Sequence, residues 1–381
     1  MGKAQEQSPL IEGHEAKEAS PPENANVTHH LTVPKLRQYN WWIQMVIFSL
    51  LVLSGQSAAT LLGRLYFDKG AKSKWMATLV QTAGFPILIP FLFVSPTKDG
   101  IAQSNQTKPP STLILVSLYT FLGVFLAAYS MLYTIGLEYL PVSTYSLICA
   151  SQLGFNAIFS YFLNAQKFTP FIVNSLFLLT ISSTLLVFSN DDSGDSNKTS
   201  KGKYVIGFMC TIAASAGYAL NLSITQLAFR KILKKETFRV VMNVIIYQSL
   251  VATCVILVGL FTSGEWRNLR REVKEYELGN VSYVMNLVWT AVTWQVFSIG
   301  AIGLIFKVSS LFSNVISTLG LPIVPVLAVF IFQDKMTGVK VVAMLLAIWG
   351  FASYIYQHYL DDLESKPESR IVNDISVVER A

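Results

Sequence analysis

Long stretches of this chain carry no charged side chain, and they follow one another from residue 38 to residue 360. Each holds at least 20 residues, which is the length that an α-helix needs to cross roughly 30 Å of hydrocarbon. Polar and apolar positions do not alternate, so membrane-spanning strands are not indicated. The charge-free stretches are residues 38–63, 75–97, 109–137, 139–166, 168–190, 204–229, 240–264, 278–306, 308–333 and 341–360.

The pattern predicts an all-α membrane protein with ten transmembrane helices, because backbone groups in lipid must be paired within their own segment. The segments between the stretches are short and leave no room for a further folded domain. We expect a disordered polar tail at residues 1–37, a linker loop at 191–203 and a C-terminal tail at 361–381.

Two of the stretches resemble each other. Leu153-Gly154 in 139–166 falls at the same spacing as Leu319-Gly320 in 308–333, five helices later. Because five is odd, two such halves would insert with opposite topology. Inverted repeats are typical of transporters, with a site near the midplane between the halves. The expected five-helix repeats are residues 38–190 and 204–360.

Stretch 308–333 is apolar but interrupted at its centre by Gly320, Pro322 and Pro325. Proline is a poor helix residue, so we expect a kink or local unwinding there. Irregular backbone at this depth is typical where it lines a cavity. A kink used for packing alone is the alternative, since membrane helices are rich in Gly and Pro.

Composition excludes several classes of protein. Charged residues make up 14% of the chain, against about 25% in soluble domains. The net charge of +6 is spread over loops, so no nucleic-acid partner is expected. Three cysteines without a CxxC motif indicate neither a disulfide framework nor a zinc site. We expect no metal and no cofactor.

The sequence also lacks the motifs of other membrane functions. It has no HExxH and no GxxxxGK[ST] motif, so an intramembrane enzyme and an ATP-driven pump are not indicated. The charge-free stretches hold no Lys or Arg to meet a phosphate group, which disfavours nucleotide sugars and phosphorylated metabolites. A channel remains open on sequence alone.

Four segments are specific enough to indicate a family. They are LLGRLYFDKGAKSKWMATLVQTAGFPIL (61–88), GLEYLPVSTYSLICASQLGFNAIFSYFLNAQKFT (136–169), KETFRVVMNVIIYQ (235–248) and SSLFSNVISTLGLPIVPVLAVFIFQDKMTGVKVVAMLLAIWGFASYIYQHYL (309–360). These segments resemble the plant purine permease family, a branch of the drug/metabolite transporter superfamily. The resemblance implies ten helices in two inverted halves and proton-coupled uptake of adenine-like bases and cytokinins, some members taking other small N-heterocycles. It implies both termini in the cytosol, which the loop charges leave undecided, and we expect the plasma membrane. Gly154 departs from the family pattern, which more often has Ala, and could alter the shape of a cavity.

A purine base is flat, with donors and acceptors along its edge. Asn or Gln can pair with an adenine edge through two hydrogen bonds, and aromatic rings can stack on its face. Gln152 and Asn156 are four residues apart and share one helix face. Amides also hold membrane helices together, so each one has that alternative role. The expected substrate-binding residues are Gln81, Gln152, Asn156, Tyr218, Tyr247, Trp294, Asn314 and Thr318.

Proton coupling has few candidate carriers. Acidic residues inside the membrane are the usual ones, and no charge-free stretch contains any. Glu138, at the end of 109–137, has no Lys or Arg near it in sequence and is the proton-coupling candidate. A structural surface acid, a water chain and titration of the substrate are alternatives. The expected partners are substrate, protons and the lipid bilayer; the sequence does not indicate an oligomeric state.

Overall fold

The protein is described by a computed structural model in which every element of the described part is helical. The described residues are 25–94, 111–140, 145, 148–166, 168–190, 201–233, 238–320, 338–339, 341–342, 345–346, 348–357 and 360. The elements are α1 Ala25–Asp68, α2 Lys74–Thr82, η1 Phe85–Leu88, α3 Ile89–Val94, α4 Thr112–Tyr139, α6 Gln152–Asn164, α7 Pro170–Asn190, α8 Lys201–Ala228, η2 Phe229–Leu233, α9 Phe238–Ser263, η3 Glu265–Arg267, α10 Leu269–Glu275 and α11 Asn280–Lys307.

The chain divides into two compact units, Met1–Gln44 and Met45–Ala381. In the first unit, the described residues form the beginning of α1, where the rings of Trp41 and Trp42 meet edge to face at 5.1 Å. Helix α1 thus begins inside the segment that we expected to be a tail. The second unit holds the rest of α1 and all other described elements.

Six helical segments in the described part are long and apolar enough to cross a membrane. The prediction of an all-helical membrane protein is therefore confirmed, and the six segments correspond to six of the ten expected spans. Helix α7 contributes a shorter apolar segment, and the last two expected spans are described only in part. The six segments are Tyr39–Asp68, Lys74–Leu92, Thr112–Tyr139, Gly202–Leu233, Phe238–Ser263 and Asn280–Lys307.

Many large apolar side chains of the described helices are exposed, whereas many of their polar side chains are buried. Phe162 is 77% exposed and Val281 is 78% exposed, while Asn156 and Asn314 are fully buried. This is the reverse of a soluble protein, in which amides lie outside and large apolar side chains are preferentially inside. The arrangement fits a bundle whose solvent is lipid.

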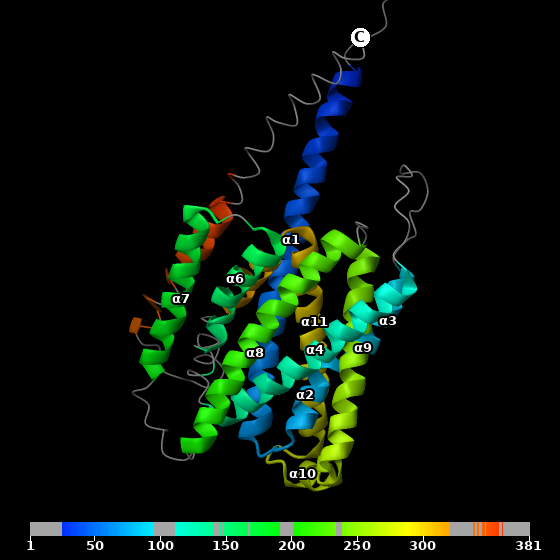
Figure 1. Ribbon diagram of the computed structural model, residues 1–381, viewed down its shortest axis with the longest axis vertical. Helices are drawn as coiled ribbons and strands as arrows, with labels where there is room; N and C mark the ends of the chain where they lie inside the picture. Colours follow the sequence, from blue (N-terminus) through cyan, green and yellow to red (C-terminus); the bar gives the residue numbers. More distant parts are fainter. Residues whose placement is uncertain are drawn as a thin grey trace, which may run out of the picture. The chain divides into compact units, whose positions relative to one another are not determined.

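Within the second unit, α4 packs against both α8 and α9, and α2 packs against α9 and α11 (Figure 1). Glycines allow the closest approaches, as is common between membrane helices. A Cβ atom added to Gly55 would lie 2.6 Å from the backbone nitrogen of Phe297, and one added to Gly123 would lie 2.7 Å from the carbonyl oxygen of Gln248. These contacts bring α1 onto α11 and α4 onto α9.

The stretch at 75–97 is broken, although we expected one continuous helix there. Helix α2 ends at Thr82, and the chain continues as the 3₁₀ turn η1 and then as α3. Pro86 lies in η1 and has no backbone N–H to continue an α-helix. The interruption expected in 308–333 is not tested, because Gly320 is the last described residue of the helical stretch 310–320 and Pro322 and Pro325 lie outside the described residues.

Candidate functional site

A cavity lies inside the second unit, between α1, α2, α4, α8, α9, α11, the start of α6 and the helical residues 310–320. Its volume is about 150 Å³. Its lining residues are Gln56, Ala59, Thr60, Gly63, Phe67, Ala77, Gln81, Thr82, Leu126, Tyr129, Ser130, Tyr133, Thr134, Leu137, Tyr145, Cys149, Gln152, Tyr218, Asn221, Leu222, Gln248, Ser249, Thr290, Trp294, Phe297, Ser298, Ala301, Ile302 and Ser317.

Aromatic rings form much of the lining. Tyr129 meets Tyr218 at a centroid distance of 5.9 Å and Tyr133 at 6.3 Å, both nearly perpendicular. On α11, Trp294 meets Phe297 edge to face at 5.4 Å. Edge-to-face pairs fix the orientation of their rings, so the cavity has pre-arranged faces against which a flat molecule can stack.

Two of the expected amides, Gln81 and Gln152, line this cavity, and both form hydrogen bonds with other side chains of the protein. The side chain of Gln152 accepts a hydrogen bond from Tyr133 at 3.2 Å and donates one to Ser317 at 3.4 Å. The amide of Gln81 donates to Thr134 at 3.0 Å. These bonds hold the polar lining in a defined geometry.

The cavity also contains polar residues that are not among the eight expected substrate-binding residues. Gln56 accepts a hydrogen bond from Ser317 at 2.9 Å. Gln248 and Asn221 each carry a buried amide oxygen that accepts no hydrogen bond from any described residue. The available signal was an amide in the middle of a charge-free stretch, but the sequence did not say which side of the helix faces inward.

Asn156 and its neighbours lie away from the cavity. The amide of Asn156 donates to the carbonyl oxygen of Ser310 at 3.0 Å and accepts from Ser223 at 2.9 Å. Ser310 in turn donates through its hydroxyl to Gln226 at 2.6 Å. This buried cluster joins α6, α8 and the residues 310–320 outside the cavity lining.

Asn314 and Thr318 are fully buried in the same helical segment and also lie outside the lining. Asn314 donates to the carbonyl oxygen of Gln152 at 2.9 Å. Tyr247 lies on the opposite side of α9 from the cavity: it is 46% exposed and stacks on Tyr119 at 5.2 Å. These three side chains could influence a ligand in the cavity only through their neighbours.

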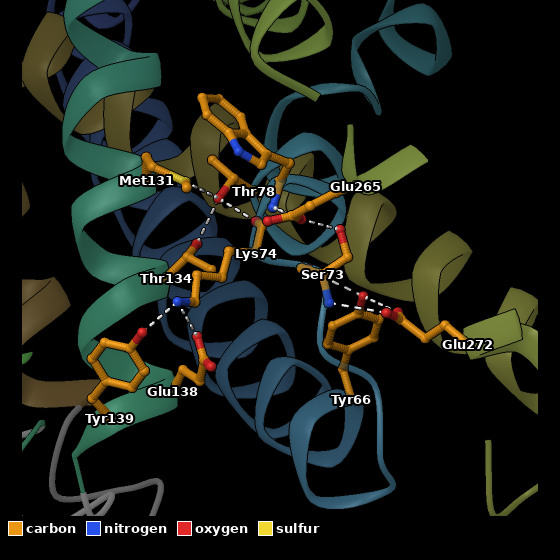
Figure 2. A network of polar contacts seen from close by, with 11 residues as sticks. Tyr66, Ser73, Lys74, Thr78, Met131, Thr134, Glu138, Tyr139, Glu265 and Glu272 are labelled. Atoms are coloured by element: carbon orange, nitrogen blue, oxygen red, sulfur yellow. Dashed lines mark hydrogen bonds and ion pairs between the residues drawn. The ribbon is translucent and has the colours of Figure 1, made fainter. Parts of the chain in front are cut away.

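The cavity reaches the end of the bundle at which α1 and α4 finish. Phe67 and Leu137 line it, one and two residues before those helices end. At its rim, the carboxylate of Glu138 lies 3.2 Å from the ammonium of Lys74, which also donates to the hydroxyl of Tyr139 (Figure 2). The cation that the local sequence around Glu138 lacks is thus supplied by the first residue of α2.

A second polar contact at this end ties the α1–α2 turn to the segment between α9 and α11. Ser73 donates its hydroxyl to Glu265 at 2.7 Å and its backbone N–H to Glu272 at 3.0 Å (Figure 2). Glu272 also accepts from the hydroxyls of Tyr66 and Tyr283 at 2.6 and 2.9 Å. Both carboxylates therefore hold Ser73, and with it the start of α2, in place.

The chemistry of the described lining favours a neutral ligand. None of the described lining residues is charged, and burying an unpaired ion is strongly unfavourable. No group of three or more His, Cys, Asp or Glu side chains that could hold a metal ion occurs in the described part of the chain. Aromatic faces with several amides and hydroxyls suit a neutral, flat molecule with a polar edge.

Comparison with known proteins gives the family of the chain. A family model described as "Purine nucleobase transmembrane transport" (PUNUT) matches residues 43–364. The chain is 59% identical to the "Probable purine permease 10" of Arabidopsis thaliana, over 91% of this chain and 87% of that protein. It is 60% identical to "Purine permease 21" of the same plant, over 87% and 85%.

A solved structure described as "Crystal structure of protein" shares the fold. It aligns with a TM-score of 0.51 at 15% identity, over 81% of this chain and 97% of that one. This similarity concerns the arrangement of helices and carries no information on the ligand. On the family match and the two permeases, the chain belongs to the purine permease family of membrane transporters and is not an enzyme.

Proposed function

We propose that this chain carries neutral purine-type bases across the membrane and that the cavity is its substrate site. The observation that carries the proposal is the uncharged lining, in which tyrosine and tryptophan rings alternate with amides. Rings stack on a base for about 1–3 kcal/mol, and amides match its hydrogen-bonding edge. Among the expected residues, Gln81, Gln152, Tyr218 and Trp294 would contact the substrate directly. Asn156, Tyr247, Asn314 and Thr318 would act indirectly.

The proposed mechanism is alternating access between two inverted five-helix repeats, residues 38–190 and 204–360. Its support is the asymmetry of the bundle: the cavity extends to the rim at Glu138, while the buried cluster around Asn156 joins its helices outside the cavity lining. Transport would require the contacts of that cluster to open and the rim to close. The proposed kink at Gly320, Pro322 and Pro325 would be the bending point for that change.

Coupling to protons through Glu138 is a further part of the proposal. Its support is the location of the carboxylate at the rim, where its ion pair with Lys74 is about one quarter exposed. Protonation of Glu138 would release Lys74 and loosen the contact between α2 and α4. The proposed substrates include adenine and cytokinin bases, and the proposed setting is the plasma membrane with both termini in the cytosol.

Radiolabelled uptake tests the proposal in yeast cells that lack their own purine uptake. We expect saturable adenine uptake that is inhibited by excess cytokinin base. We expect AMP to be neither substrate nor inhibitor, because no described lining residue carries a positive charge that could form an ion pair with its phosphate. AMP transport at a rate comparable to adenine would reject the proposed site. Uptake that does not saturate would indicate a channel.

A further inference from the structure

Two amide oxygens in the cavity lack a hydrogen-bond donor. Gln248 on α9 and Asn221 on α8 both line the cavity, and their side chains are 4% and 5% exposed. Neither Gln248 Oε1 nor Asn221 Oδ1 accepts a bond from any residue in the described ranges. Buried polar atoms in native proteins are almost always paired, so each oxygen favours a ligand that brings an N–H or O–H group.

The other amides of the cavity are partly used by the protein. Both amide atoms of Gln152 are bonded, to Tyr133 and to Ser317. The amide nitrogen of Gln81 is bonded to Thr134, and the amide oxygen of Gln56 accepts from Ser317. A ligand would have to break these bonds before using those atoms. Gln248 and Asn221 can instead accept a ligand's hydrogen bond without losing one of their own at these oxygens.

The two oxygens come from helices on either side of α4, which packs against both α8 and α9 (Figure 1). A ligand that satisfies both must therefore present two N–H or O–H groups. Resting on the proposed function, we infer that Asn221 and Gln248 determine specificity by each accepting one N–H of the substrate. Adenine meets this demand, with an amino group on its six-membered ring and a ring N–H on its five-membered ring.

Methylated bases test this inference on the unaltered protein, with labelled adenine uptake as the readout. N6,N6-dimethyladenine lacks the amino N–H groups, and 9-methyladenine lacks the ring N–H. We expect each to compete about tenfold more weakly than adenine, since one lost hydrogen bond at a buried acceptor has about that effect. Equal competition by all three bases would overturn the inference while adenine uptake itself continued.

Two variants show which amide oxygen accepts which N–H group of the base. Gln248→Met and Asn221→Leu keep the size of the side chain and remove the acceptor. In each variant, we expect adenine to compete about tenfold more weakly than in the unaltered protein. We also expect one of the two methylated bases to compete as well as adenine, while the other still competes more weakly. Gln295→Met is the matched control, because Gln295 is 2% exposed and also has an unpaired amide oxygen but does not line the cavity.

The outcomes separate the inference from the proposed function. If Gln248→Met and Asn221→Leu reach the membrane, take up adenine and keep the wild-type ranking of the three bases, the two residues do not determine specificity. If Gln295→Met changes the ranking as much as they do, the effect comes from packing and the inference fails. If the unaltered protein at normal surface abundance takes up no adenine, the proposed function itself is rejected.

Discussion

At the scale of single residues, the direction of a side chain decides whether it can meet a substrate in the cavity. On α9, Tyr247 was selected and is exposed, whereas its neighbour Gln248 lines the cavity. Adjacent residues on a helix point about 100° apart, and a membrane helix with polar residues on several sides gives no clear inward face. The selection of Asn156 rested on depth and helix spacing, and its actual partners on α8 and at Ser310 are invisible in sequence.

Stacking should be measurable at Trp294. Replacing it with alanine removes a cavity wall, and we expect the apparent affinity for adenine to fall by about 5- to 150-fold, corresponding to the 1–3 kcal/mol of a base–ring contact. Trp289→Ala is the control, because Trp289 lies on the same helix and is 53% exposed. Equal effects of the two substitutions would show that the loss comes from α11 as a whole rather than from stacking.

Asn156 should matter for stability rather than affinity. Asn156→Ala leaves the carbonyl of Ser310 and the hydroxyl of Ser223 without this partner inside the bundle, at a cost of about 1–3 kcal/mol. We expect a lower melting temperature of the purified protein and an apparent affinity for adenine within about twofold of wild type. Weaker binding with unchanged melting would instead indicate direct contact with the substrate.

At the scale of elements, close helix contacts control the shape of the cavity. The break after Thr82 was not predicted, because Pro86 alone did not distinguish a kinked helix from two separate ones. Helix crossings at glycines were equally hidden, since the sequence contains 22 glycines and only some meet another backbone. Gly154, the departure from the family pattern, is exposed and lies outside the cavity lining, so it does not shape the wall as expected.

Two glycine substitutions test whether close helix contacts determine the shape of the cavity. In Gly123→Ala the new Cβ would lie 2.5 Å from Val251 Cβ and 2.7 Å from the carbonyl of Gln248, so α9 must move away from α4. We expect adenine uptake per transporter at the cell surface to fall severalfold. Gly154→Ala meets nothing within 4 Å and should keep wild-type uptake. Full uptake by Gly123→Ala would contradict the importance of this helix contact.

At the scale of the whole molecule, charge-free length predicted the membrane class well, because burial in lipid leaves few other solutions. Six helical segments that are long and apolar enough to cross a membrane agree with that prediction, and the family match covers residues 43–364. The ion pair of Glu138 could not be predicted, since its partner Lys74 is distant in sequence and adjacent only in the folded bundle. The inverted arrangement of ten helices remains a proposal.

Proton coupling belongs to this scale. Glu138→Gln keeps the size of the side chain but cannot release a proton, so we expect net uptake to lose its stimulation by external acid while exchange of labelled for unlabelled adenine continues. Glu277→Gln is the control, because Glu277 pairs with Lys69 in an exposed ion pair at the same end of the bundle. Acid stimulation that survives in Glu138→Gln would rule Glu138 out as the carrier.

The central claim is that the purine occupies the cavity, and a thiol placed at Ser298, a partly exposed lining residue, can report on it. The measurement is the rate at which a small thiol reagent alkylates the thiol introduced by Ser298→Cys, in a protein that also carries Cys149→Ala, Cys210→Ala and Cys254→Ala, with and without saturating adenine. We predict that adenine slows alkylation at the concentrations that saturate uptake and that AMP does not. An alkylation rate unchanged by adenine, in protein that still transports it, would contradict the account.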